Sequence, residues 1–289
     1  MDAKQGKDMA WYSKIGAAVK DKVQGKDQGC VLPEIVGNVP DDPRQWRGFE
    51  LAEAMEQGLG PGLSLLHIEP PPEIAMKEER LVVVRAQNRS SYKLQDEAGK
   101  TVMIAKPSAD GLRFELHVGH EETQRPAFLL SAASSARNDW DLTSVRCEEC
   151  ELRGKRQCGR RSLMRLTHYV ESVGEGQAFC MDVELPCKLE DGSRAVLCDC
   201  CGDASASWSV ELTARRPKWN PKHKSLTLDF HGRCSMASAK NFQLEDAERP
   251  GKYMFLFGKV AENRFTLDHK YPLGAVQAFA ISLSASHWK

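Results

Sequence analysis

The sequence contains no long uncharged apolar run and no excess of charge of either sign. No stretch reaches the roughly 18 apolar residues that a membrane-spanning helix needs. The first ten residues mix lysines with aspartates and lead into no apolar segment, so we expect neither an integral membrane protein nor a Sec-exported one. Lysines plus arginines number 40 and aspartates plus glutamates number 40, which gives a formal net charge of zero. Since nucleic-acid-binding domains normally carry a basic surface, this balance argues against nucleic acid as a partner.

Motifs of the common enzyme classes are also missing. The chain has no Gly-x-Ser-x-Gly elbow, no His-Glu-x-x-His metal motif, no P-loop and no dinucleotide fingerprint. Glu262 and Asp268 lie close together near the C-terminus, where we expect them to fix turns and not to act as a catalytic pair. We therefore predict a protein that is not an enzyme and that needs no cofactor.

Ten cysteines without a secretory signal indicate a reducing compartment, so we expect the protein in the cytoplasm. Six of them form two groups, Cys147, Cys150 and Cys158, then Cys198, Cys200 and Cys201. A thiolate pair from each group could form a tetrahedral zinc site, and the alternative is that all six are free thiols. Because the second group lacks the Cys-x-x-Cys spacing, we predict that the purified protein carries no stoichiometric zinc.

Residues 1–80 are interpreted as an N-terminal arm. An amphipathic helix of about four turns is expected near its start, and its apolar residues include Trp11, Tyr12, Ile15 and Val19. Such a helix docks on a partner or on a membrane surface, or it packs on its own domain. A proline-rich linker follows and enters a second domain, which we predict at 81–289.

The second domain is predicted to be mainly β. Short β-prone runs follow one another with turn residues between them, and 112–118 alternates between apolar and polar residues as a half-buried strand does. The other expected strands are 81–84, 92–94, 101–105, 128–131, 163–170, 178–185, 194–198, 208–213, 225–230 and 253–258. About ten short strands that do not alternate with helices indicate a sandwich or a barrel.

One segment near the C-terminus breaks this pattern. Residues 272–285 carry no charge, and their apolar residues point to every side of the helix that they would form. A helix that is apolar all round has to be buried all round, and this one is too short to span a membrane. The inside of a barrel is the place in a β protein that surrounds a helix. We therefore predict a closed antiparallel β-barrel that encloses a hydrophobic C-terminal α-helix.

Several stretches of the C-terminal third resemble the signature of the tubby C-terminal domain. They are Leu226–Arg233 (LTLDFHGR), Ala237–Gln243 (ASAKNFQ), Phe257–Glu262 (FGKVAE), Phe265–Asp268 (FTLD), Tyr271–Leu273 (YPL) and Gln277–Ile281 (QAFAI). The resemblance covers roughly residues 208–286, and a weaker one covers 81–118. It implies a closed barrel of about twelve antiparallel strands filled by the C-terminal helix, which agrees with the prediction from the apolar segment.

The resemblance also implies a function. Tubby-like domains bind phosphoinositides, chiefly phosphatidylinositol 4,5-bisphosphate, through a basic pocket on the barrel wall and act as adaptors that tether partners to membranes. In this chain the pocket falls on Arg85, Arg89, Lys93 and Lys106. Lysines and arginines from neighbouring strands give charge-assisted hydrogen bonds to phosphates. Ser108 stands where the family has an arginine, so at least one strong phosphate ligand is missing.

Two functions therefore remain open. In the first, the protein is a phosphoinositide-binding adaptor in ciliary trafficking, whose partners are a phosphoinositide membrane surface and the proteins that it tethers. In the second, it is a structural or scaffolding protein of a cilium or flagellum axoneme that keeps the barrel and has lost lipid binding. The expected location is the cytoplasm, either in a cilium or flagellum or peripherally at the plasma membrane.

Overall fold

The structure is a computed structural model that describes residues 78–120, 125–145, 160–189, 194–198 and 207–288. The predicted N-terminal helix around Trp11 lies outside the described residues. The strands are β1 (Glu79–Arg85), β2 (Tyr92–Asp96), β3 (Thr101–Pro107), β4 (Arg113–Val118), β5 (Phe128–Ala132), β6 (Asp139–Ser144), β7 (Ser162–Val173), β8 (Gly176–Pro186), β9 (Trp208–Ala214), β10 (Lys218–Asn220), β11 (Ser225–Thr227), β12 (Phe242–Asp246), β13 (Tyr253–Ala261) and β14 (Arg264–His269), and the helix is α5 (Ala275–His287).

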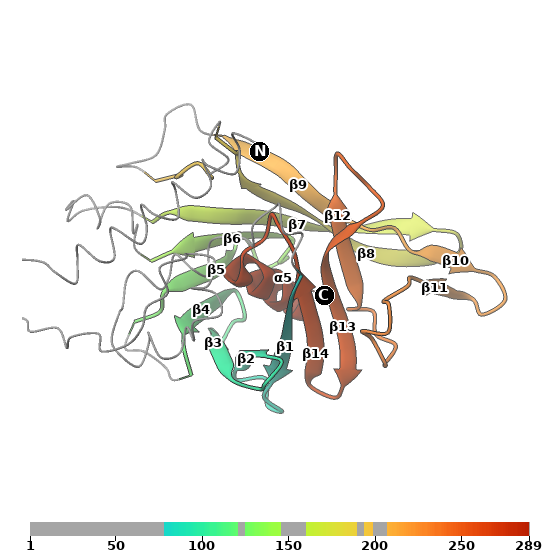
Figure 1. Cartoon of the computed structure of the whole chain (residues 1–289), viewed down its shortest axis with the longest axis horizontal. Helices are drawn as coiled ribbons and strands as arrows, with labels where there is room; N and C mark the ends of the chain where they lie inside the picture. The colour runs from blue at the N-terminus through green and yellow to red at the C-terminus, as the bar shows by residue number, and fades with distance from the viewer. Residues whose placement is uncertain (1–77, 121–124, 146–159, 190–193, 199–206, 289) are drawn as a thin grey trace, which may run out of the picture.

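Twelve of these strands close into one antiparallel barrel (Figure 1). The order around the ring is β1-β14-β13-β12-β9-β8-β7-β6-β5-β4-β3-β2. Strand β1 closes the ring, because Val83 is opposite Leu94 of β2 on one side and Phe265 of β14 on the other. A closed ring of strands presents no free edge to which another strand could add. The barrel predicted from the sequence is therefore confirmed.

One of the predicted strands is wrong and another is too long. Residues 194–198 form only isolated bridges, Lys188 with Arg194 and Ser162 with Leu197, and are not a strand of the barrel. The run 225–230 ends as a strand at Thr227, because the chain turns there: the backbone N–H of His231 donates to Oδ1 of Asp229, and His231 has a φ of +50°. The shortened strand is β11, which pairs with β10 in a two-stranded sheet separate from the barrel.

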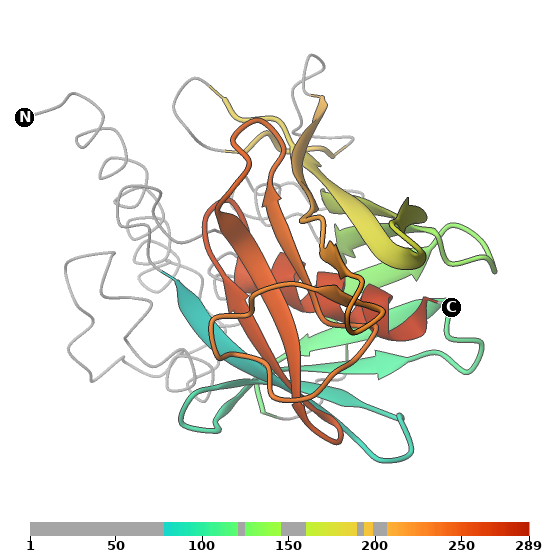
Figure 2. The ribbon, with the colours of Figure 1, turned by 90° about the vertical axis from the view of Figure 1, so that its right-hand side faces the viewer.

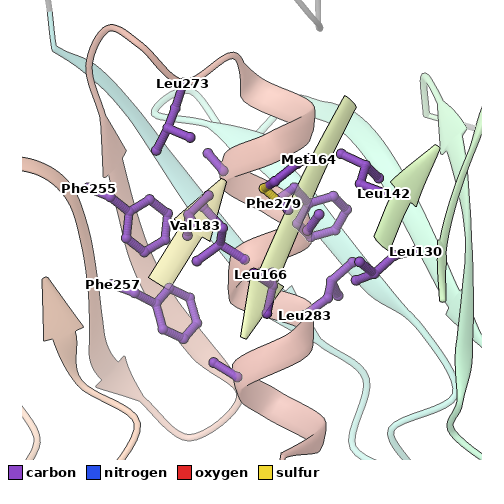
Figure 3. Packing of buried hydrophobic residues seen from close by; sticks show 14 of the residues in the cluster. Leu130, Leu142, Met164, Leu166, Val183, Phe255, Phe257, Leu273, Phe279 and Leu283 are labelled. Atoms are coloured by element: carbon purple, nitrogen blue, oxygen red, sulfur yellow. The ribbon is translucent and has the colours of Figure 1, made fainter. Parts of the chain in front are cut away.

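Helix α5 lies lengthwise inside the ring of strands (Figure 2). Every residue from Val276 to Ala285 is buried, on all sides of the helix. Figure 3 shows Phe279 and Leu283 between phenylalanines of β13 on one side and leucines of β5 and β6 on the other. Because apolar area is removed from water around the whole circumference, α5 and the inner faces of the strands form one continuous core. The predicted central helix is confirmed.

The polar side chains of α5 bond within the helix. The hydroxyl of Ser282 donates to the carbonyl oxygen of Phe279 at 2.7 Å, and the hydroxyl of Ser284 donates to that of Ile281 at 2.8 Å. At the start of the helix the backbone N–H of Gly274 donates to the side chain of Gln277. Buried polar groups are costly only when they lack a partner, so these bonds allow the helix to be buried.

Strands β7 and β8 form a long hairpin whose outer face is covered by the β10–β11 hairpin. The cover is tight at Gly174, where a Cβ atom would stand 2.5 Å from Cγ of Trp219. Gly174 also has a φ of +62°, which favours glycine. One face of the hairpin tip is thus occupied by Trp219, and only the opposite face remains for other contacts.

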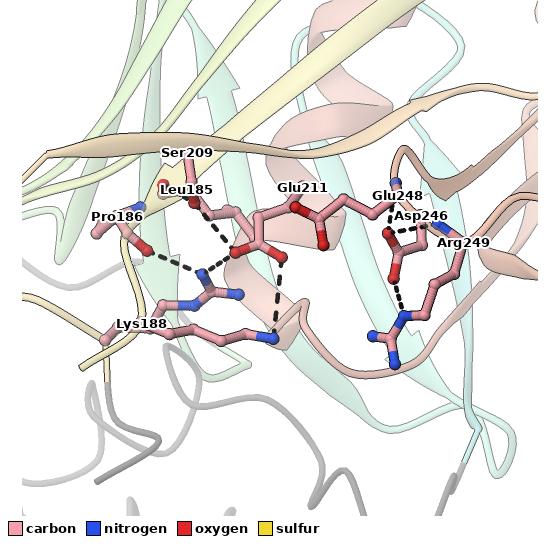
Figure 4. Close-up of polar contacts among 9 residues, drawn as sticks. Leu185, Pro186, Lys188, Ser209, Glu211, Asp246, Glu248 and Arg249 are labelled. Atoms are coloured by element: carbon pink, nitrogen blue, oxygen red, sulfur yellow. Dashed lines mark hydrogen bonds and ion pairs between the residues drawn. The ribbon is translucent and has the colours of Figure 1, made fainter. Parts of the chain in front are cut away.

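A polar network anchors the segment that follows β8 to β9 (Figure 4). Nη1 of Arg194 donates to Oε1 of Glu211 and to the carbonyl oxygen of Pro186, both at 2.8 Å. Ser209 also donates to Glu211, at 3.1 Å, and Nζ of Lys188 stands 4.0 Å from its other oxygen. The isolated bridge at Arg194 is therefore held by side-chain bonds and not by a strand ladder.

Candidate anion-binding site

The four predicted ligands lie on the neighbouring strands β1, β2 and β3 or in the turn that joins the first two. Arg85 is the last residue of β1, and Arg89 lies in the turn with a φ of +58°. Lys93 is on β2 and Lys106 is on β3. The structure thus places all four in one region of the barrel, as two pairs that face different ways.

Arg85 and Arg89 lie at the end of the barrel where α5 terminates. Arg85 is opposite Tyr92, whose hydroxyl oxygen is 3.0 Å from Nε2 of His287. Nε of Arg85 donates to Oδ1 of Asn263 at 2.9 Å, which fixes the guanidinium group. Arg89 is exposed, and its side chain has no bonded partner among the described residues. One arginine is therefore anchored and the other is available to a ligand.

Lys93 and Lys106 project from the outer face of the barrel wall. Their strand neighbours Leu94 and Ala105 are fully buried, and the pleat turns alternate side chains to opposite faces. Because Lys93 is opposite Ile104, Lys106 is its diagonal neighbour, about 7–8 Å away. Lys93 is exposed, without a bonded side-chain partner in the part of the chain that the structure describes.

Ser108, at the position of the missing arginine, is a turn residue. Its hydroxyl donates to Oδ1 of Asp110 at 2.5 Å and accepts from the backbone N–H of Arg113 at 3.0 Å. Glu115 is opposite Lys106 in the register of β3 with β4, and it also pairs with Arg113 at 3.0 Å. The carboxylate reduces the positive potential on this part of the wall.

Another group of cations, which the sequence prediction missed, gathers around the C-terminal end of α5. Nζ of Lys240 donates to the carbonyl oxygens of Ala285 at 2.9 Å and Ser286 at 2.6 Å. Nη1 of Arg137 donates to the carbonyl oxygen of His287 at 3.2 Å. The last carbonyls of a helix lack partners within it and carry partial negative charge, which these cations complement.

Electrostatic coupling joins this group to two of the predicted ligands. Burial and then the charges of Arg85 and Arg89 lower the pKa of Lys240 to about 8. Burial and then the charges of Arg137 and Lys240 lower the pKa of His287 to about 4, so its ring is neutral at pH 7. Burial is the larger cause of both pKa shifts, and the neighbouring cations add to it; a bound anion would oppose the part that the cations contribute.

One signal in the sequence could have found Lys240. A helix that is buried all round needs donors for its last carbonyls from elsewhere in the chain. Lys240 is the only charged residue in the stretch 234–244, which is otherwise small, polar or apolar. The sequence around Arg137 gives no such signal, because Arg137 lies in a polar turn between β5 and β6, where charged residues are common.

The described residues contain no cluster of histidine, cysteine or acidic side chains that could hold a metal ion. Cys198 forms no disulfide within them, while Cys147, Cys150, Cys158, Cys200 and Cys201 lie outside them. The absence of zinc therefore stays a prediction. The described helix is not long and apolar enough to cross a bilayer.

Known proteins resemble the C-terminal half of the chain most clearly. The model of the Tub family matches residues 150–287. Tubby-related protein 1 of Homo sapiens is 51% identical over 76 residues, which are 26% of this chain and 14% of that protein. Tubby protein homolog 1 of Caenorhabditis briggsae is 46% identical over 78 residues, 27% of this chain and 18% of that protein. Protein king tubby of Anopheles gambiae is 41% identical over 114 residues, 36% of this chain and 26% of that protein.

A closed barrel around a hydrophobic C-terminal helix, with these similarities, defines a tubby-type domain. Residues 150–287 belong to the tubby family. It spans 14–26% of the length of these relatives. The four predicted ligands precede residue 150 and therefore lie outside the span that the family model matches.

Proposed function

We propose that this protein is a non-enzymatic tubby-like adaptor that binds the headgroup of phosphatidylinositol 4,5-bisphosphate and tethers partners to membranes in ciliary trafficking. Membership of the tubby family supports the non-enzymatic role. The observation that carries the binding proposal is the position of Arg85, Arg89, Lys93 and Lys106 on the neighbouring strands β1, β2 and β3 and in the turn that joins the first two.

The physical chemistry of the site suits a phosphorylated headgroup. Arg89 and Lys93 are exposed and carry no protein partner among the described residues, so their donors can turn to phosphate oxygens. Arg85 and Lys240 add positive potential near Arg89, since the charges of both arginines act on Lys240. Each hydrogen bond to a charged group contributes about 1.5–3 kcal/mol. Two or three such bonds suffice for binding when the headgroup is held in a bilayer.

Removal of single ligands tests the site. We expect Lys106→Ala and Arg89→Ala each to weaken binding to vesicles that contain phosphatidylinositol 4,5-bisphosphate by about 10- to 150-fold, since each removes one charged hydrogen bond. Lys218→Ala, on β10 outside the barrel, makes the same change of charge and is the control. Vesicle co-sedimentation measures all three. If Lys218→Ala weakens binding as much as the other two, attraction is general and no site exists.

The pKa of Lys240 predicts a dependence on pH. Lys240 loses its proton as the pH rises through about 8, whereas an exposed lysine keeps it to about 10.5. The cluster therefore loses one positive charge between pH 7.5 and 9, and binding to the same vesicles should weaken over that range. In Lys240→Arg the charge persists, because a guanidinium group stays protonated. An equal decline in Lys240→Arg would show that another group titrates.

The second candidate function is scaffolding in the axoneme of a cilium or flagellum, with lipid binding lost. Two observations favour it: Ser108 is used in a turn, and Lys240 and Arg137 already bind the carbonyls of α5. In this case the partners would be axonemal proteins, docked through the N-terminal segment that contains Trp11. Proteins recovered from native axonemes with the chain, together with absence of lipid selectivity, would identify this function.

A further inference from the structure

An apolar pair on the β7–β8 hairpin is exposed beyond the end of the barrel. Val170 of β7 and Phe179 of β8 are directly opposite each other and are 49% and 48% exposed. Two positions nearer the barrel, His168 and Met181 are opposite each other on the same face and are buried. The hairpin therefore carries its apolar face past the edge of the core, while Trp219 covers the other face.

Trp288 extends this apolar patch, which we define as Val170, Phe179 and Trp288. Its ring meets Phe179 edge-on at 5.0 Å and stacks on His168 at 4.7 Å. Nε1 of the same ring donates to Oδ1 of Asn138 at 3.0 Å, which fixes the indole in place. Trp288 follows α5 directly, so the apolar patch lies at the end of the barrel where the helix terminates (Figure 2).

The same end of the barrel carries the cations of the candidate site. Lys240 and Arg137 bind the last carbonyls of α5. Arg85 and Arg89 act on Lys240 and on His287, one residue before Trp288. The carboxylate of Glu171, beside Val170, is paired with Arg216 at 2.7 Å and adds little free negative charge. Cations and exposed apolar side chains therefore surround the end of one helix.

This combination is complementary to one kind of partner, the surface of an anionic bilayer. Cations near the surface attract anionic headgroups, and aromatic and aliphatic side chains enter the boundary between headgroups and acyl chains. A soluble phosphorylated ligand would use the cations alone. A groove on another protein could cover the apolar patch, but this would give the cations beside it no role.

We propose that the end of the barrel at which α5 terminates docks on the bilayer, with Val170 and Phe179 inserted into the interface while the cations hold the phosphoinositide. This inference rests on the proposed function, to which it adds a second contact and an orientation. The C-terminus of α5 points toward the membrane, and the β10–β11 hairpin stays on the outer side of the inserted tip.

The test uses the full chain with Val170→Ser and Phe179→Ser combined. Both side chains are exposed, so the fold should be unaffected, and the thermal unfolding midpoint checks this. We expect partition onto phosphatidylcholine vesicles that contain phosphatidylinositol 4,5-bisphosphate to fall about tenfold. Binding of soluble inositol 1,4,5-trisphosphate should be unchanged. The matched control is Val210→Ser, a 50% exposed valine on β9 that is opposite Glu184, about 17 Å along β8 from Phe179.

The outcomes separate the membrane insertion from the proposed phosphoinositide-binding function. Loss of vesicle binding with the soluble ligand still bound, and no effect of Val210→Ser, supports membrane insertion. Vesicle binding as in wild type overturns the insertion and leaves the proposed function standing. If the double variant instead abolishes a concentration-dependent dimer, the apolar patch belongs to a protein contact and the insertion is wrong. Failure of wild type to bind both the soluble ligand and the vesicles overturns both proposals.

Discussion

Phe279→Asp is expected to unfold the barrel domain. Phe279 is fully buried near the middle of α5, with side chains from both walls around it (Figure 3). Removal of a buried phenylalanine ring alone costs about 3–5 kcal/mol, and a carboxyl group without a partner in the core costs several more. A typical domain has a free energy of unfolding of about 5–15 kcal/mol. Most molecules should therefore lack the β signal in circular dichroism and show no cooperative urea transition.

The same substitution at an exposed phenylalanine is the control. Phe179 is 48% exposed, so Phe179→Asp should change the free energy of unfolding by no more than about 0.5 kcal/mol. A cooperative urea transition of Phe279→Asp at the wild-type midpoint would contradict the placement of α5 inside the barrel.

Asp268→Ala should lower the free energy of unfolding by about 3 kcal/mol, because it leaves a cation without its partner. Asp268 is fully buried on β14, and its two oxygens accept from Nε and Nη2 of Arg233 at 2.6 and 2.5 Å. The carbonyl oxygen of Arg233 also accepts from the hydroxyl of Thr266 at 2.7 Å. The pair thus ties the loop before β12, which carries Lys240, to β14, and Asp268→Ala should also weaken vesicle binding.

An exposed pair of the same type is the control for this variant. Asp141 and Arg165 stand 3.2 Å apart on β6 and β7, and both side chains are about half exposed. Exposed pairs contribute about 0–1 kcal/mol, so Asp141→Ala should leave the urea midpoint nearly unchanged. Equal effects of the two variants would mean that burial does not strengthen the Arg233–Asp268 pair.

The parts of the fold that the sequence predicts are those with a dense local signal. The uncharged segment 272–285 predicts a buried helix, and the helix runs from Ala275 to His287, because Gly274 is the N-cap and the residues before it turn. The predicted strands leave out β6, β10, β12 and β14, and the local signal is weakest where few residues are apolar. In β6, only Trp140 and Leu142 are apolar among six residues; Ser144 is buried on the same face, and the other three residues are exposed or half-buried. Trp140 is paired with Leu166 of β7, which lies far along the chain, so a local pattern cannot predict the pairing.

The candidate site is less predictable than the fold, because it depends on where separate segments meet. Arg85, Arg89, Lys93 and Lys106 lie in consecutive segments, so their proximity follows from adjacent strands. Lys240 reaches the same region from a loop that is more than 130 residues away in sequence, and only the closed ring brings it there. The opposite orientation of the two predicted pairs is set by the pleat and by the turn after β1, which composition does not encode.

The central proposal is that the barrel recognises a phosphoinositide by geometry and not by charge alone. The most direct measurement compares wild-type binding to vesicles with phosphatidylinositol 4,5-bisphosphate and to phosphatidylserine vesicles of equal surface charge, at physiological salt, where exposed charges are screened beyond about 8 Å. Because Ser108 stands where the resemblance to the tubby domain implies an arginine, and its hydroxyl is bonded within a turn, we expect a weak but measurable preference for the phosphoinositide. Equal affinity for the two kinds of vesicle would contradict the adaptor function and leave the scaffolding function in its place.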